Sequence, residues 1–202
     1  MSYKSKPLPL TFVCAATESK LFPADSGNEI ALCGRSNSGK STLINTLANQ
    51  KKLAKTSNTP GRTQSINFFH LVNDEGKKII DLPGFGYAKA SKQDQNAWGK
   101  LILSYLEKRS ALTDLILIMD MRHPFQNKDL EFLNLCKSLN LPIHLVLTKA
   151  DKLNNKESQT ALKVVSEKMA DYPAIVDSIV FSATKKIGLE TLLNKTRLLL
   201  EI

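Results

Sequence analysis

The stretch GRSNSGKST, residues 34–42, constrains the fold more than any other part of the sequence. It has the spacing Gly-x-x-x-x-Gly-Lys-Ser, directly after the apolar run EIALCG and directly before a segment of helical pattern. In such a strand–loop–helix context, backbone amides of the loop point at phosphate oxygens and the helix N-terminus adds positive partial charge. We therefore expect a phosphate-binding loop in which Lys40 reaches the outer phosphates and the Ser41 hydroxyl binds magnesium.

Short apolar runs alternate with longer amphipathic segments along the chain, the pattern expected of crossover units around a mainly parallel sheet. Only NDEG separates the second predicted strand from the third, and so short a connection joins antiparallel neighbours. We therefore predict an α/β fold whose mixed, mainly parallel six-stranded sheet is flanked by helices on both faces. The predicted strands are EIALCG, SINFFHLV, KKIIDL, DLILIMD, IHLVLTK and SIVFSA. The predicted helices are residues 40–48, about 92–109, about 128–139, about 156–170 and 188–200.

The composition is that of a single globular domain. A chain of 202 residues can bury a core without disulfides, and its three cysteines are odd in number and lack C-x-x-C spacing. We expect free thiols in a reducing compartment, and hence a cytoplasmic protein. We also expect a monomer. Pro7 and Pro9 interrupt the segment LPLTFVCAA, which makes it a poor signal peptide, and no apolar run approaches the length of a membrane span. Residues 1–28 are expected to be an N-terminal extension packing on a domain formed by residues 29–202.

The net charge of +9 is large for a chain of this size. It would attract a phosphate-rich partner such as RNA, DNA or an anionic membrane. The Lys and Arg residues are scattered, however, and no run of five like charges occurs, so solubility alone is an equal explanation.

Two further loops specify the nucleotide. The strand KKIIDL ends in DLPG, which places Asp81 where it can hold magnesium through water and Gly84 where its amide can meet a terminal phosphate. IHLVLTK runs into TKAD, and the Asp151 carboxylate can accept two hydrogen bonds from the ring N1–H and the exocyclic amine of guanine. The stem of Lys149 can lie along the base plane. An ATP-dependent enzyme such as a kinase is disfavoured because adenine lacks that pair of donors.

The segment NTPGRTQS lies between the phosphate loop and DLPG and has the composition of a flexible turn. Thr63 is the candidate whose hydroxyl completes magnesium coordination when a third phosphate is present. A loop ordered by the terminal phosphate and released after hydrolysis is a switch.

With GRSNSGKST, TPGRTQS, DLPGFGYA, TKAD and FSAT in this order and spacing, the chain resembles the EngB family (also called YihA or YsxC), small bacterial GTPases linked to ribosome assembly. The resemblance runs from about Glu29 to the C-terminus. It implies a Ras-like P-loop GTPase fold, magnesium-dependent GTP hydrolysis, association with the large ribosomal subunit or its rRNA, and a requirement for normal cell division and septation.

The resemblance also implies a set of site residues. The magnesium ligands are Ser41 and Thr63, with Asp81 acting through water. The residues assigned to catalysis are Lys40, Thr63 and Gly84, together with Asn37 as a candidate potassium ligand. The nucleotide contacts are Gly34, Arg35, Ser36, Asn37, Ser38, Gly39, Lys40, Ser41, Gly61, Arg62, Thr63, Gln64, Ser65, Asp81, Leu82, Pro83, Gly84, Thr148, Lys149, Ala150, Asp151, Phe181, Ser182 and Ala183.

Two positions bear on the mechanism. Ras-type enzymes place a glutamine directly after Asp-x-x-Gly to orient the attacking water, whereas this chain has Phe85 there, so we predict slow intrinsic turnover. Asn37 has two open roles. It could ligate a potassium ion that stabilises the transition state, as in related potassium-stimulated GTPases, or it could only favour the turn conformation of the loop.

Four basic residues lie in or beside the predicted loops: Arg35, Arg62, Lys89 and Lys92. If they face outward together, GTP would change the shape of a basic surface, as an RNA sensor requires. The alternative is that some of them only neutralise nucleotide phosphates. A GTP-responsive RNA- or protein-binding module in which hydrolysis is incidental is the second function that the sequence allows.

Overall fold

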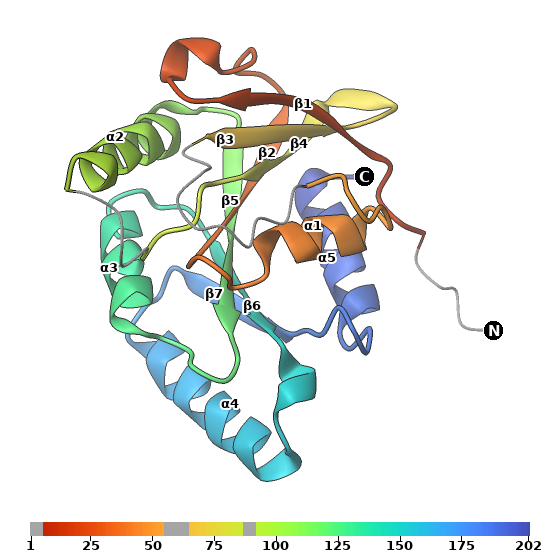
Figure 1. The fold of residues 1–202 in the computed structure, drawn as a ribbon, viewed down its shortest axis with the longest axis vertical. Helices are drawn as coiled ribbons and strands as arrows, with labels where there is room; N and C mark the ends of the chain where they lie inside the picture. The colour runs from red at the N-terminus through yellow and green to blue at the C-terminus, as the bar shows by residue number, and fades with distance from the viewer. Residues whose placement is uncertain (1–5, 55–64, 87–91) are drawn as a thin grey trace.

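A seven-stranded sheet runs through the centre of the molecule, with α2, α3 and α4 on one face and α1 and α5 on the other (Figure 1). The computed structural model describes residues 6–54, 65–86 and 92–202, without the side chains of 92–95. The strands are β1 (Leu10–Ala16), β2 (Asn28–Gly34), β3 (Ile66–Leu71), β4 (Asp74–Asp81), β5 (Leu112–Asp120), β6 (Ile143–Thr148) and β7 (Ile175–Val180). The helices are α1 (Lys40–Leu47), α2 (Lys92–Lys108), α3 (Asn127–Cys136), α4 (Asn155–Ala170) and α5 (Leu189–Leu200), with short 3-10 turns η1 (Ser19–Leu21) and η2 (Ala150–Lys152).

The strand order is β1-β3-β4-β2-β5-β6-β7, in which β3 runs antiparallel to both of its neighbours and the other pairs are parallel. The central strands are apolar throughout because each face is covered by helices. In β2, Ile30 and Leu32 face the core under α1 and α5, whereas Ala31 and Cys33 face the core under α2, α3 and α4. This alternation explains why the sequence shows continuous apolar runs there rather than a period of two.

The predicted α/β class and mixed parallel sheet are confirmed, but the count of six strands is wrong. The seventh strand, β1, pairs antiparallel with β3 from Leu10 opposite Leu71 to Ala16 opposite Ile66. Its sequence, LTFVCAA, lies in the segment assessed as a poor signal peptide. The register shifts between Phe12 and Cys14, and this shift breaks the alternation by which a half-buried strand is predicted.

The predicted C-terminal strand is also shifted. SIVFSA was expected to span residues 178–183, but β7 begins at Ile175 and ends at Val180, so Phe181 to Ala183 lie in the loop beyond it. β7 is an edge strand with exposed residues such as Val176, and its N-terminal half therefore lacks the continuous apolar pattern. Helix bounds agree with the prediction within one to three residues.

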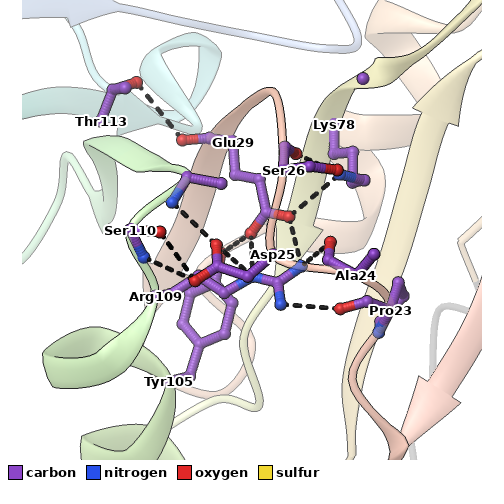
Figure 2. A network of polar contacts seen from close by, with 12 residues as sticks. Pro23, Ala24, Asp25, Ser26, Glu29, Lys78, Tyr105, Arg109, Ser110 and Thr113 are labelled. Atoms are coloured by element: carbon purple, nitrogen blue, oxygen red, sulfur yellow. Dashed lines mark hydrogen bonds and ion pairs between the residues drawn. The ribbon is translucent and has the colours of Figure 1, made fainter.

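A buried polar network lies at the start of β2, the end of the strand opposite the phosphate loop. Figure 2 shows its contacts. Glu29, at the start of β2, is fully buried and accepts hydrogen bonds from Arg109 at 2.6 and 2.8 Å and from the Tyr105 hydroxyl at 2.9 Å. Lys78 lies 3.4 Å from the same carboxylate. Asp25 accepts hydrogen bonds from the chain just after α2. The network therefore ties the segment before β2 to the C-terminal end of α2.

Residues before β2 thus contribute to the same sheet and to the same core. Leu8 is buried, and its amide donates to the Leu47 carbonyl at the end of α1. The boundary at residue 28 between an N-terminal extension and the main domain remains a proposal.

Among the helices in the described ranges, none combines the length and the apolar character that a membrane crossing requires.

Candidate nucleotide-binding site

The predicted motifs meet at one edge of the sheet, because parallel strands bring their carboxyl ends together. β2 ends at Gly34, β4 at Asp81, β5 at Asp120 and β6 at Thr148, and the loop after each strand opens on this edge (Figure 1). This is where ligands bind in open α/β sheets.

The loop of residues 34–39 has the backbone of a phosphate cradle. Asn37 and Gly39 have φ values of 64° and 106°, which turn the chain sharply before α1 begins at Lys40. A Cβ at Gly34 would lie 2.4 Å from the Ile118 carbonyl oxygen, so only glycine fits there. Gly39, the N-cap of α1, provides no side-chain cap for the first turn. The amides of that turn are therefore suited to an anion.

Lys40 and Asp81 form the charged centre of this loop. The Lys40 ammonium donates to the Gly34 carbonyl at 3.2 Å. Burial lowers the pKa of Lys40 and raises that of Asp81, and the attraction between these two opposite charges counteracts both shifts. An added charge of opposite sign would therefore stabilise the charged form of each group. Such a charge would be a phosphate at Lys40 and a cation at Asp81.

The oxygen groups of the phosphate loop and of Asp81 are of the kinds that bind magnesium. Asp81 Oδ1 is buried and accepts no hydrogen bond from the described residues, and Ser38 Oγ is likewise buried without a partner there. Ser41, the predicted direct ligand, follows Lys40 in the first turn of α1. Hydroxyl and carboxylate oxygens are the ligand types that magnesium takes alongside phosphate oxygens.

The loop after β6, which is predicted to bind the base, is tied to the phosphate loop by two side chains. Lys149 has a φ of 61°, and its ammonium donates to the Asn37 carbonyl at 2.8 Å, so that its side chain spans from one loop to the other. The Thr148 hydroxyl donates to the Ser38 carbonyl at 2.6 Å and fixes the same two loops together. The predicted position of Lys149 along a base plane is consistent with this span.

Asp151 is oriented by the last predicted motif. The Ser182 hydroxyl donates to Asp151 Oδ1 at 2.6 Å, and this hydrogen bond is the main cause of the lowered pKa of Asp151. The Ala150 amide donates to the Phe181 carbonyl at 3.2 Å, which joins the two loops through their backbones. The Asp151 carboxylate, which is predicted to bind guanine, is therefore ionised and is held in place by Ser182.

The segment after Asp81 lies against the phosphate loop. Phe85 pairs with that loop through its backbone, since the Ser36 amide donates to the Phe85 carbonyl at 3.0 Å. A Cβ at Gly84 would lie 3.0 Å from the Lys40 ammonium and 3.1 Å from the Ser36 nitrogen. A side chain at this position would require its neighbours to shift by a few tenths of an ångström, so glycine suits this close approach. The Gly84 amide is thus near the groups predicted to hold the terminal phosphate.

The Phe85 side chain points away from those groups. Its ring stacks on Phe132 of α3 and meets the edge of Trp98 of α2, whose indole N–H donates to the Pro83 carbonyl. Phe85 is 7% exposed. It is therefore a core residue joining α2 and α3 to the loop, and it has no polar group for orienting water.

Arg35 does not face outward as the basic-surface hypothesis supposed. Its guanidinium lies 3.2 Å from the fully buried Asp129 and donates to the His123 carbonyl at 3.0 Å. Desolvation makes an unpaired Asp129 costly, and Arg35 is the cation that compensates it. The side chain of Arg35 therefore anchors the phosphate loop to the start of α3.

Several predicted residues cannot be placed in this way. Gly61, Arg62, Thr63, Gln64 and Lys89 lie outside the described residues, as does the side chain of Lys92. Ser65 is buried just before β3, and Leu82 is buried and donates its amide to the Leu32 carbonyl. Ser36 and Ala183 belong to the loops already described.

Sequence reasoning missed one residue of this edge. Asp120 ends β5, is 7% exposed, and lies 2.9 Å from the Lys149 ammonium. The sequence signal for Asp120 is its position at the end of the apolar strand DLILIMD, at the same edge as Asp81. Asp120 belongs to none of the nucleotide-binding motifs.

Comparison with known proteins agrees with this geometry. The family described as "50S ribosome-binding GTPase" matches residues 29–149. A probable GTP-binding protein EngB of Haemophilus influenzae (strain 86-028NP) is 44% identical over 91% of this chain and 89% of its own length. The probable GTP-binding protein EngB of Salmonella newport (strain SL254) is 42% identical over 91% of this chain and 87% of its own length.

Solved structures show the same fold. The crystal structure of a probable GTP-binding protein engB has a TM-score of 0.67 at 26% identity and covers 86% of this chain and 98% of its own. Era, whose crystal structure is in complex with MgGDPNP and nucleotides 1506-1542 of 16S ribosomal RNA, is similar in fold alone, with a TM-score of 0.65 at 24% identity over 84% of this chain and 55% of Era.

The sheet, its phosphate loop and these relatives define the molecule as a P-loop GTPase. Within that class the resemblance noted in the motifs is confirmed. The chain belongs to the EngB family of GTP-binding proteins.

Proposed function

We propose that the protein binds GTP and GDP with magnesium, hydrolyses GTP slowly, and acts as a nucleotide switch in assembly of the large ribosomal subunit. The observation that carries the proposal is the meeting of two sites at one sheet edge. Lys40 and Asp81 supply the charges for phosphate and metal, and Asp151, held by Ser182, supplies a carboxylate for guanine.

The chain's own residues define the roles in hydrolysis. Lys40, the loop amides and the Gly84 amide hold the outer phosphates and offset charge that grows in the transition state. Ser41 and Thr63, with Asp81 acting through water, would hold magnesium, which would neutralise charge on the phosphates. Because Phe85 packs against α3, no side chain at that position orients water, and this supports slow intrinsic turnover.

The partner is proposed from family membership and charge. The matching family is described as ribosome-binding, and a net charge of +9 favours a partner rich in phosphate. From the resemblance we also propose that loss of the protein would impair cell division and septation, through ribosome supply or directly. We further propose that the protein is cytoplasmic and monomeric.

The test is to sediment cell extract on a gradient with GDP or a non-hydrolysable GTP analogue. The protein is expected to move with large ribosomal subunits in one nucleotide state more than in the other. Failure to co-sediment in either state would overturn the ribosomal part of the proposal, while nucleotide binding would be measured separately on the purified protein.

A binding module in which hydrolysis is incidental is the second candidate. The buried Phe85 favours it, since this chain lacks the usual water-orienting side chain. A variant that binds GTP but cannot hydrolyse it decides between the two: retention of ribosome assembly in cells would favour the module.

A further inference from the structure

Asp120 lies beside the loop that follows β6 and contacts it directly through Lys149. It pairs in register with Thr148 across the β5–β6 ladder, so its carboxylate stands next to the residue that follows, Lys149. The distance from Asp120 Oδ2 to Lys149 Nζ is 2.9 Å. The same ammonium donates to the Asn37 carbonyl at 2.8 Å.

Two anchors therefore hold the end of the Lys149 side chain. One is the phosphate loop, through a neutral carbonyl, and the other is a nearly buried carboxylate on the sheet. A lysine side chain has four rotatable bonds, and fixing its ammonium removes most of their freedom before any ligand arrives. The aliphatic stem, along which the base is predicted to lie, is then restricted in conformation before the base binds.

We propose that Asp120 is a positioning residue for the nucleotide base, acting through Lys149. The proposal rests on the guanine-nucleotide function proposed above and extends it to a residue outside the predicted motifs. Asp120 contacts neither base nor phosphate in this arrangement. Its effect is to pre-organise the stem of Lys149 and so reduce the entropy lost on binding.

The carboxylate stays charged over the working pH range. Burial acts to raise the pKa of Asp120, but hydrogen bonds from Arg122 and Lys149 outweigh it and hold the pKa well below its ordinary value. Arg122 donates through its guanidinium at 2.7 and 2.9 Å and through its amide at 3.1 Å. The competing explanation is that Asp120 only shapes the turn at Arg122.

A double-mutant cycle on GDP affinity separates these explanations. Asp120→Asn keeps the shape and removes the charge, Lys149→Met keeps an unbranched apolar stem and removes the ammonium, and Arg122→Gln is the matched control. We expect Asp120→Asn to weaken GDP binding about tenfold. In the Lys149→Met background the same change should cost less than about twofold, because the partner is gone. Arg122→Gln should leave GDP affinity within about twofold of the wild type.

Base selectivity provides a readout that a general loss of structure would not reproduce. Inosine diphosphate lacks the exocyclic amine but presents the same purine plane. Asp120→Asn should therefore weaken GDP and inosine diphosphate by the same factor, whereas Asp151→Asn should change their ratio. Thermal melting of the nucleotide-free variants reports folding, and Asp120→Glu, which restores the charge, should recover part of the affinity if Asp120→Asn folds poorly.

The proposal is overturned if Asp120→Asn binds GDP as the wild type does, if Arg122→Gln weakens binding as much, or if the losses from Asp120→Asn and Lys149→Met add fully. A changed ratio of GDP to inosine diphosphate in Asp120→Asn would also overturn it. Failure of the wild type to bind GDP would instead refute the proposed function, so the two failures are distinguishable.

Discussion

The ring of Phe85 stacks on the ring of Phe132, with centroids 4.9 Å apart and an angle of 10° between their planes. The first residue belongs to the loop after β4 and the second to α3. The contact fixes the direction of the side chain at the position where other GTPases carry their water-orienting glutamine.

Phe85→Gln is therefore expected to lower stability without accelerating hydrolysis. The change removes a buried ring and places an amide among Phe132 and Trp98, at a cost of about 2–4 kcal/mol. Urea unfolding measures the stability and single-turnover hydrolysis measures the rate. Phe12→Gln, at a ring that is 48% exposed, is the control and should cost less. Faster hydrolysis in Phe85→Gln would show that this side chain can reach the phosphates.

Ser182→Ala is expected to weaken guanine nucleotides about fivefold, because it removes the 2.6 Å hydrogen bond that orients Asp151. Ser178→Ala, at an exposed serine of β7, is the matched control. Titration with GDP measures both variants.

Asp151→Asn should lose GTP affinity and favour xanthine nucleotides, and unchanged GTP affinity would contradict the base assignment.

Glu29→Gln is expected to destabilise the protein by about 3–5 kcal/mol. The change leaves the buried guanidinium of Arg109 and the Lys78 ammonium without their carboxylate (Figure 2). Chemical denaturation measures the loss, and Glu201→Gln at the exposed Lys77–Glu201 pair should change little. Equal effects of the two changes would contradict the structural importance of this network.

Asp25→Asn is expected to lower the melting temperature at neutral pH, with the difference from wild type vanishing in acid. Burial acts to raise the pKa of Asp25, but the amides of Ala111 and Ser110, the Ser110 hydroxyl and Arg109 together lower it. A lowered pKa in the folded state stabilises the fold at pH values above the unfolded pKa, which is about 4. This stabilisation is lost as the pH falls below that value and through the folded pKa. Melting curves from pH 7 to 3 measure it, and a constant difference across that range would contradict the assignment.

Potassium is expected to accelerate GTP hydrolysis relative to sodium if Asn37 ligates the ion. The φ of 64° at Asn37 also suits the alternative, that the residue serves only the turn. Asn37→Gly keeps the left-handed backbone and removes the amide, so it should lose the potassium effect while still binding GDP. Equal wild-type rates in the two salts would exclude the ion, and a potassium effect that survives in Asn37→Gly would assign it to other groups.

Much of the sheet and most of the site could be predicted because their signals are local. A glycine loop after an apolar strand, DLPG and TKAD each encode a turn within a few residues, and parallel strands bring such turns to one edge. Helix bounds followed from periodicity in the same way. β1 was missed because its bulge interrupts the alternation on which strand prediction depends.

The sequence by itself determined the class of fold, the nucleotide loops and the family, since these depend on residue types at fixed short spacings. Only the tertiary structure decided where side chains point. Arg35 turns to Asp129, Phe85 turns to α3, and Asp120 holds Lys149, each across 29 or more residues of chain. Such pairings depend on which elements the crossovers place side by side and on the cost of burying an unpaired charge, and neither is written in any local pattern.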